Sequence, residues 1–366
     1  MSTRTGRGAM TVGVVAMAVT LAACGGGSKS GDGSETKKKD LKIGLLLPEK
    51  QAARYEKSDK PLIEKMVSEL TSGKGQVVYA NAEQDAARQN QQVDEMIGKK
   101  VDALIIDAVD SKAIGGAVQR AHEAGIPIVA FDRLAEGPVD AYVSFDNEDV
   151  GHVQARALLD NLGTKAKDGQ IVMMNGARTD PNAAQFKKGA HSELDGKVSI
   201  GKEYDTKEWK PENAAANMRT AISALGKDKI IGVYSANDGM AGGIISALKA
   251  AGVSKLPPIT GQDTELAGVQ RIVAGEQFMS VYKSYAEESP IAAQMAVALA
   301  KKQSLISIAN SKTNSPTKSD IPTALVPVVA VIKENIRSTV VGDGLYTIDE
   351  ICTAKYKAAC KSAGLQ

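Results

Sequence analysis

A regular alternation of apolar strands and amphipathic helices constrains the fold of this chain more than any other feature. Stretches such as VDALIIDAV and IPIVAFD are mostly apolar, and segments such as SKAIGGAVQRAHEAG lie between them with helical spacing of their apolar residues. This alternation is typical of a parallel sheet with helices on both faces. The pattern starts at Leu41 and restarts at EDVGHVQARALLDNLG, so we expect two doubly wound α/β lobes.

Polar side chains gather where the expected strands end. The stretch GIPIVAFDR is apolar until it reaches Asp132 and Arg133. A cap with a surface ion pair would explain these two charges. The other strands favour a different explanation, because they also finish in polar residues: Glu49, Asp146, Asn147, Asp180, Asn237, Asp238, Asp263 and Lys283. Ligands of open α/β sheets bind outside the carboxyl ends of the strands, so we expect these residues to line one cleft between the lobes.

The residue types at these strand ends suit a neutral ligand with many hydroxyl groups. Carboxylates accept hydrogen bonds from hydroxyls, while Arg, Lys and Asn side chains donate to the same oxygens. The single Trp of the chain, Trp209, lies in EYDTKEWKPEN, just after an expected strand. We expect its ring to stack on the apolar face of a sugar. Packing within its own loop is the alternative.

Motifs of several enzyme classes are missing from the sequence. No G-x-G-x-x-G follows a strand, and there is no P-loop, G-x-S-x-G or H-E-x-x-H. DNEDVG loosely resembles a calcium loop, but it lacks the later ligands and more simply caps the next helix. The three histidines are scattered at His122, His152 and His191. We therefore expect no catalysis, no cofactor and no metal site.

The N-terminal residues have the features of a lipoprotein signal. Arg4 and Arg7 precede the apolar stretch AMTVGVVAMAVTLAA, which is shorter than the ~20 residues that span a bilayer. The stretch ends in LAAC, which resembles a bacterial lipobox and implies cleavage before Cys24 and a lipid on its thiol. The alternative is an ordinary secretory signal with an incidental cysteine. The following GGGSKSGDGSETKKKD has no apolar residue and predicts a flexible tether.

Charge and cysteine content limit the partners further. Without Arg4 and Arg7 the chain has 43 basic and 43 acidic residues, so nothing suggests the basic patch of a nucleic-acid binder. The other two cysteines, Cys352 and Cys360, lie near the C-terminus. In the oxidising exterior that the signal implies, we expect them to form a disulfide bond.

Several motifs occur in series and resemble those of the type I periplasmic sugar-binding proteins. They are FDR, SFDNE-VG, W-PENA, SAND--AGG, GQD-ELAG--RI-AG and VYK, and the resemblance covers Leu41 to about Gly344. Within that family, the pattern is closest to members that bind D-xylose or several monosaccharides. The resemblance implies the solute receptor of an ATP-driven importer, with two lobes joined by three crossovers and no catalysis.

The resemblance also implies a set of ligand-binding residues. By motif these are Arg54, Tyr55, Asp132, Arg133, Asn182, Trp209, Asn237, Asp263 and Lys283. Tyr55 occupies the position where the xylose-binding members carry Trp, which leaves the width of the pocket and the identity of the sugar open. Xylose is the first expectation, and glucose and arabinose are alternatives. A receptor that reports a sugar or sugar-like signal to a membrane sensor would have the same site. A sugar-modifying enzyme would need a paired acid and base.

The expected division of the chain follows from these interpretations. We assign residues 1–23 to the signal peptide and 24–40 to the lipidated Cys24 and its tether. An N-terminal lobe is expected over 41–147 plus 284–320, and a C-terminal lobe over 148–283 plus 321–366. Hinges are expected near Asp146–Asn147, Lys283–Ser284 and Pro316–Pro322. The expected partners are a monosaccharide, the importer's permease and the membrane through the lipid, with a monomeric receptor.

Overall fold

The computed structural model describes residues 40–365, which belong to one compact unit. The predicted signal peptide, the lipidation at Cys24 and residues 24–39 of the tether lie outside the described residues. Between residues 40 and 365, no helix combines the length and the apolar character needed to cross a bilayer.

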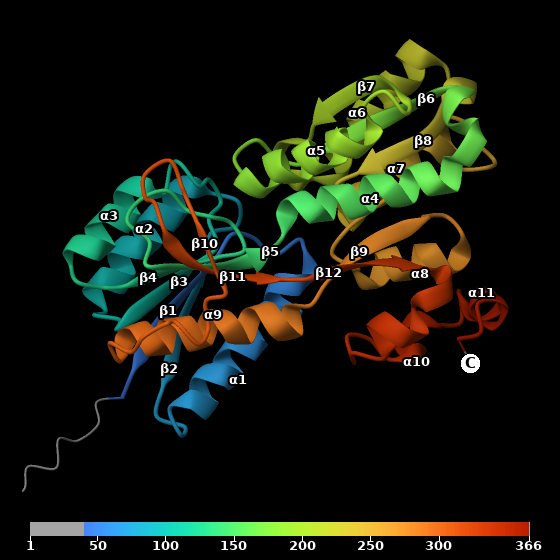
Figure 1. Ribbon diagram of the computed structural model, residues 1–366. Coiled ribbons are helices and arrows are strands. Elements are labelled where there is room, and N and C mark those ends of the chain that lie inside the picture. The colour runs from blue at the N-terminus through green and yellow to red at the C-terminus, as the bar shows by residue number, and fades with distance from the viewer. Residues whose placement is uncertain (1–39, 366) are drawn as a thin grey trace, which may run out of the picture. The chain divides into compact units, whose positions relative to one another are not determined.

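The first lobe is built on a seven-stranded sheet with the order β10-β11-β5-β4-β3-β1-β2 (Figure 1). Every neighbouring pair is parallel except β10 and β11. Helices α1 and α9 pack on one face, and α2 and α3 on the other. The strands are β1 (Lys42–Leu47), β2 (Gln76–Asn81), β3 (Ala103–Ile106), β4 (Ile128–Phe131), β5 (Ala141–Phe145), β10 (Ser311–Thr313) and β11 (Ile321–Val326). The helices are the short turn η1 (Tyr55–Asp59), α1 (Lys60–Leu70), α2 (Ala86–Gly98), α3 (Gly115–Glu123) and α9 (Tyr285–Ala300).

The second lobe contains the parallel sheet β7-β6-β8 and the antiparallel pair β12-β9. The segment 258–263 joins them, because it exchanges backbone hydrogen bonds with Val233 on one side and with Phe278 and Val281 on the other. The strands are β6 (Gln170–Asn175), β7 (Ser199–Asp205), β8 (Ile230–Ser235), β9 (Met279–Lys283) and β12 (Val328–Ile332). The helices are α4 (Asn147–Leu162), η2 (Gly163–Lys167), α5 (Pro181–Leu194), η3 (Lys207–Trp209), α6 (Pro211–Leu225), η4 (Lys227–Lys229), α7 (Asp238–Ala250) and α8 (Leu266–Ala274).

Helices α4 and α5 approach each other closely because each carries a glycine at their crossing. A Cβ atom on Gly151 of α4 would overlap the carbonyl oxygen of Phe186, and one on Gly189 of α5 would overlap the carbonyl oxygen of Glu148. The backbones therefore pack directly on each other. This contact fixes the position of α5 against α4, and the start of α5 reaches the first lobe through Asp180 and Asn182.

The chain passes between the two lobes at three places, and one of them differs from the prediction. The first two lie between β5 and α4 and between β9 and α9, close to the expected Asp146–Asn147 and Lys283–Ser284. The third was expected near Pro316–Pro322, with residues from 321 onward in the second lobe. That boundary is wrong, because β11 pairs with β5 in the first sheet over Thr323–Val326. The crossing lies at Pro327, between β11 and β12.

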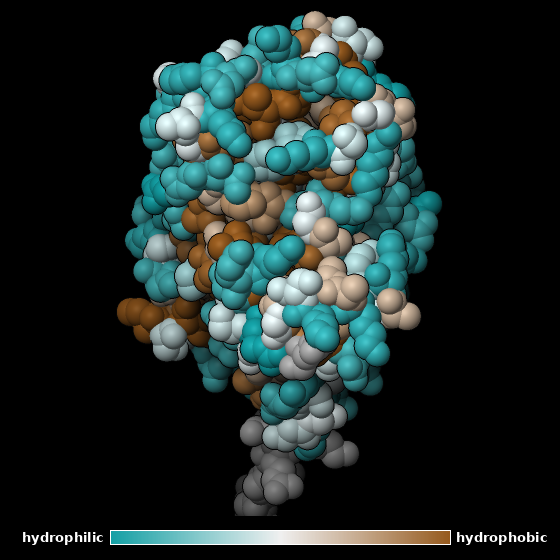
Figure 2. Space-filling view, turned by 90° about the vertical axis from the view of Figure 1, so that its right-hand side faces the viewer, coloured by the Kyte–Doolittle hydropathy of each residue, from teal (hydrophilic) through white to brown (hydrophobic). Residues whose placement is uncertain are grey.

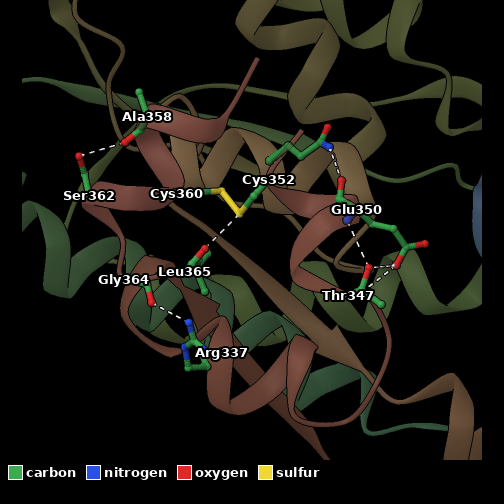
Figure 3. The surroundings of a disulfide bond; sticks show 10 residues. Arg337, Thr347, Glu350, Cys352, Ala358, Cys360, Ser362, Gly364 and Leu365 are labelled. Atoms are coloured by element: carbon green, nitrogen blue, oxygen red, sulfur yellow. Dashed lines mark hydrogen bonds between the residues drawn. A yellow bond between two sulfur atoms is a disulfide. The ribbon is translucent and has the colours of Figure 1, made fainter. Parts of the chain in front are cut away.

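The end of the chain folds onto the second lobe as a chain of short helices. They are η5 (Lys333–Asn335), η6 (Arg337–Val341), α10 (Ile348–Ile351) and α11 (Lys357–Ser362), and they pack around α8. The predicted disulfide between Cys352 and Cys360 is present and ties α11 to the end of α10 (Figure 3). Arg337 Nη2 donates to the carbonyl of Gly364, which holds the last turn in place. On this side the surface is largely hydrophilic with scattered apolar patches (Figure 2).

Candidate functional site

A cavity of about 190 Å³ lies between the strand ends of the two lobes. It is smaller than the ~300–1,000 Å³ of pockets for drug-sized ligands, so it suits a small molecule. All nine ligand-binding residues predicted from the sequence line this cavity. They are Arg54, Tyr55, Asp132, Arg133, Asn182, Trp209, Asn237, Asp263 and Lys283.

Asp132 lies at the centre of the first-lobe part of the cavity. Its backbone follows β4 in a left-handed conformation with φ of 57°, which is uncommon for a residue with a side chain. Three side chains hold its carbonyl oxygen: Tyr142 Oη at 2.9 Å, Ser144 Oγ at 2.8 Å and Asn182 Nδ2 at 3.1 Å. Surroundings that fix a strained backbone so completely are common at functional sites.

Arg54, which also lines the cavity, holds the carboxylate of Asp132. Its Nη1 donates to Asp132 Oδ2, its Nε lies 2.7 Å from Asp59 Oδ2, and its Nη2 lies 2.7 Å from Glu288 Oε2. Glu288 comes from α9, far along the chain. Burial alone would raise the pKa of Asp132, but the charges of Arg54, Lys283 and Arg133 outweigh it and hold the pKa below its usual range. Asp132 is therefore an ionised hydrogen-bond acceptor at neutral pH.

Contacts between protein atoms join the two lobes beside the cavity. Asn182 Nδ2 at the start of α5 donates to Asp132 Oδ1 at 2.7 Å, and Arg133 Nε lies 2.9 Å from Asp180 Oδ2. The backbone N–H of Ser111 donates to the carbonyl of Thr179 at 3.2 Å. The charges of FDR are thus not a surface ion pair, because both side chains are buried and reach the other lobe.

The second lobe contributes a matching acid and base. Lys283 at the end of β9 places its Nζ 2.7 Å from Asp263 Oδ1, and both residues are buried. The Asp263 backbone has a φ of 86°, and its N–H and C=O are held by Val281 and by Tyr285 Oη. Asn237 caps α7, with its Oδ1 accepting from Met240 N at 2.8 Å. Its amide N–H₂ group is therefore the part that can serve a ligand.

Trp209 combines the two roles that the sequence left open. Its ring lines the cavity and also packs edge-on against Phe186, with ring centroids 6.3 Å apart. The ring lies so close over Gly176 that a Cβ atom there would overlap it. The indole Nε1 is buried without a hydrogen-bond partner among the described residues. The packing on Phe186 and Gly176 fixes a ring that lines the cavity and whose N–H donor has no partner of its own in the described structure.

Several lining residues were absent from the predicted set: Glu49, Gln84, Asp180, Phe186, Glu208, Gln262 and Glu265. The strand-end pattern already predicts two of them, Glu49 and Asp180, in the cleft. It also predicts Asp146, Asn147 and Asp238 there, and these do not line the cavity: Asp146 caps α4, and Asp238 is held inside the second lobe by Gln277 and Ser280. Gln262 and Glu265 flank Asp263 in the GQD-ELAG motif, and only the turn of the backbone brings both to the cavity. Burial, together with Asp238 and Asp263, raises the pKa of Glu265 to about 8.

Comparison with known proteins identifies the family. The family model described as "Periplasmic binding protein domain" matches residues 43–304. The D-xylose-binding periplasmic protein of Haemophilus influenzae is 35% identical over 324 residues, covering 87% of this chain and 94% of that protein. The multiple sugar-binding periplasmic receptor ChvE of Rhizobium radiobacter is 32% identical, covering 84% and 92%.

A solved structure has the same fold. The solute-binding protein of an ABC transporter from Clostridium phytofermentans, with bound β-D-glucose, superposes with a TM-score of 0.76 at 26% identity. It covers 85% of this chain and 99% of that one. The expectations of a two-lobed α/β fold and of a binding protein rather than an enzyme are both confirmed. This chain is therefore a solute-binding protein of the periplasmic binding protein family, with the type I fold.

Proposed function

We propose that the protein binds a monosaccharide in the cavity between its lobes, with D-xylose as the first candidate, and delivers it to an ATP-driven importer. The same proposal places the receptor outside the cell membrane, held there by a lipid on Cys24. One observation carries it: two buried carboxylates, Asp132 and Asp263, come from opposite lobes to one small cavity, each held by a cation.

The chemistry of the cavity supports a sugar. Each hydroxyl of a monosaccharide donates one hydrogen bond and accepts others, and the cavity offers both kinds of partner. Asp132 and Asp263 accept, while Asn237, Lys283 and the indole of Trp209 donate. The relatives point the same way, since their names record binding of D-xylose or of several sugars, and the compared structure holds glucose.

The strength of binding expected of such a receptor is consistent with these contacts. A dissociation constant of 1 μM corresponds to about 8 kcal/mol. Hydrogen bonds to charged groups contribute ~1.5–3 kcal/mol each before ordering costs are subtracted. Four such contacts, from Asp132, Arg133, Asp263 and Lys283, would supply most of that free energy.

Calorimetry on the purified protein tests the proposal. D-Xylose, L-arabinose, D-glucose and D-ribose are titrated separately, and we expect one-to-one binding of at least one of them, strongest for xylose. The resemblance implies a larger ring where this chain has Tyr55, so a hexose that binds more tightly than xylose would change the sugar but keep the site. No heat with any pentose or hexose would contradict the proposal. Uptake of the labelled sugar by cells with and without the protein then separates transport from signalling.

A further inference from the structure

The cavity is lined by more acidic than basic side chains. Its carboxylates are Glu49, Asp132, Asp180, Glu208, Asp263 and Glu265, against the cations Arg54, Arg133 and Lys283. Each of these cations is already paired with a carboxylate. A ligand with many hydroxyls and no charge does not require this excess.

Four of the six carboxylates have a basic partner, and two do not. Asp132, Asp180 and Asp263 pair with the cavity cations, and Glu208 lies 3.3 Å from Lys207 Nζ. Glu49 and Glu265 form no ion pair with any residue between 40 and 365. We call these two side chains the Glu49–Glu265 subsite.

The two glutamates come from opposite lobes. Glu49 lies in the loop after β1, is 5% exposed, and accepts hydrogen bonds from the backbone N–H groups of Gln51 and Ala52. Glu265 caps the start of α8, where its backbone N–H donates to Asp238 Oδ2 at 2.9 Å. Its carboxyl group makes no hydrogen bond within the described part of the chain. The Glu49 carboxylate is thus held by backbone N–H groups, and the Glu265 carboxyl group is left without a partner of its own in this part of the chain.

A third acceptor lines the same cavity and indicates which ligand group the subsite would bind. Gln262 is 2% exposed and lines the cavity, and its Oε1 is buried without a hydrogen-bond partner among residues 40–365. A buried acceptor without a donor is costly, so the site calls for a ligand group rich in donors. A primary ammonium group has three donors, no acceptor and a positive charge.

We infer that the Glu49–Glu265 subsite binds the ammonium group of an amino sugar and disfavours sugar acids. The inference rests on the proposed monosaccharide function and narrows its ligand class. At neutral pH Glu265 would release its proton to solvent when the ammonium group binds. A uronate carboxylate in the same place would meet two acids and gain no cation, because the cavity cations are already paired.

Matched sugars test the inference by calorimetry on the full chain. D-Glucose is compared with its 2-, 3- and 6-amino derivatives and with D-glucuronate, and D-xylose with 2-amino-2-deoxy-D-xylose. We expect one amino sugar to bind about ten- to a hundredfold more tightly than its parent, which is the effect of one or two hydrogen bonds to a charged group. Glucuronate should bind at least tenfold more weakly than glucose.

Charge-removing variants assign the effect to the subsite. Glu49→Gln and Glu265→Gln should each reduce the amino-to-parent affinity ratio about tenfold, with thermal unfolding as the check on folding. Glu64→Gln removes a charge from an exposed position on α1 and should leave the ratio unaltered. The inference is overturned if a parent sugar binds and no amino derivative binds more tightly, or if both variants keep the wild-type ratio. If neither parent nor amino sugar binds, the proposed function itself fails.

Discussion

At the scale of single residues, the site depends on side chains whose positions are set by unusual backbone. Asp132 and Asp263 both have positive φ, and each is fixed by hydrogen bonds to its own peptide groups. The carboxylates are thereby turned out of their sheets toward the cavity. Such pre-organisation lowers the ordering cost that a ligand would otherwise meet.

Asp263 provides the most direct test of the binding site. Asp263→Asn should weaken sugar binding roughly ten- to a hundredfold, because a neutral amide replaces the charged acceptor beside Lys283. Asn tolerates the left-handed backbone that this position requires, so folding should be kept. Trp209 is the only Trp of the chain and lines the cavity, so its fluorescence should change on binding and provides the readout. An Asn variant with wild-type affinity would place the site elsewhere.

Buried acids in the second lobe give the stability a predictable pH dependence. Burial raises the pKa of Asp238 to about 7, although Arg271 opposes the shift, and the pKa of Glu265 is raised to about 8. The folded protein therefore binds more protons than the unfolded chain, whose acids titrate near ~4. The free energy of unfolding should fall by about 1 kcal/mol or more from pH 5 to pH 8.

Urea unfolding at the two pH values measures this change. Glu265→Gln removes one of the titrating groups, so the loss of stability between pH 5 and pH 8 should become smaller. Glu64→Gln, an exposed variant, should keep the wild-type dependence. Equal or greater stability at pH 8 in the wild type would contradict the assignment.

Some of the site residues could be predicted from the sequence and others could not, for a physical reason. Parallel strands end at one edge of a sheet, so polar residues at strand ends could be assigned to one cleft before the structure was known. The Arg54 network could not, because Glu288 and Ser289 approach Asp59 and Arg54 from α9, more than two hundred residues away. No local pattern records such a contact.

At the scale of secondary-structure elements, the crossing of α4 and α5 connects packing to the site. Asp180, Asn182 and Phe186 lie in the first half of α5 or cap it, and the contact through Gly151 and Gly189 fixes the position of that helix.

The apolar segment near the C-terminus shows what a hydrophobic pattern cannot reveal. The apolar pattern of ALVPVVAVIK predicts one strand, but Pro327 separates it into β11 and β12, which belong to different sheets. An apolar run does not reveal which sheet it joins.

Gly189→Ala should disturb this crossing. The new methyl group would overlap the backbone of Glu148, so the helices must separate, at a cost of about 1–3 kcal/mol in the free energy of unfolding. Sugar affinity should fall together with the stability, because Asn182 lies on the same helix. Gly98→Ala in α2 is the matched control, since open space surrounds that position, and it should be neutral or slightly stabilising. Equal stabilities for the two variants would reject the close-packing argument.

The short helices at the C-terminus form a second group of packed elements, which the disulfide ties together. The bridge spans eight residues, for which the chain-entropy model gives about 2.5 kcal/mol. A double Cys352→Ser and Cys360→Ser variant should therefore lose up to ~2.5 kcal/mol of stability. Proteolysis should cut the variant first within 345–365, with fragments read by mass spectrometry. An unaltered digestion pattern would show that packing on α8 holds the segment without the bridge.

At the scale of the whole molecule, the proposed anchor is tested apart from the fold. Cys24→Ser should abolish incorporation of labelled fatty acid and release the protein from washed membranes, because a lipobox without its cysteine cannot be lipidated. Sugar binding by the variant should equal that of the wild type. Equal membrane retention of the two proteins would favour the ordinary secretory signal instead.

The contacts that join the lobes affect how much ATP the proposed importer would hydrolyse without carrying sugar. Three pairs involve protein atoms only: Asn182–Asp132, Arg133–Asp180 and Ser111–Thr179. They can therefore form whether or not sugar is present. Each such contact raises the share of empty receptors whose lobes are already joined, and an importer that senses only joined lobes would hydrolyse ATP for no cargo. Selection for high sugar affinity would therefore strengthen these three pairs, and selection against ATP hydrolysis without sugar would weaken them. Weakening one of them, as in Asn182→Ala, should lower idle ATP hydrolysis and sugar affinity together.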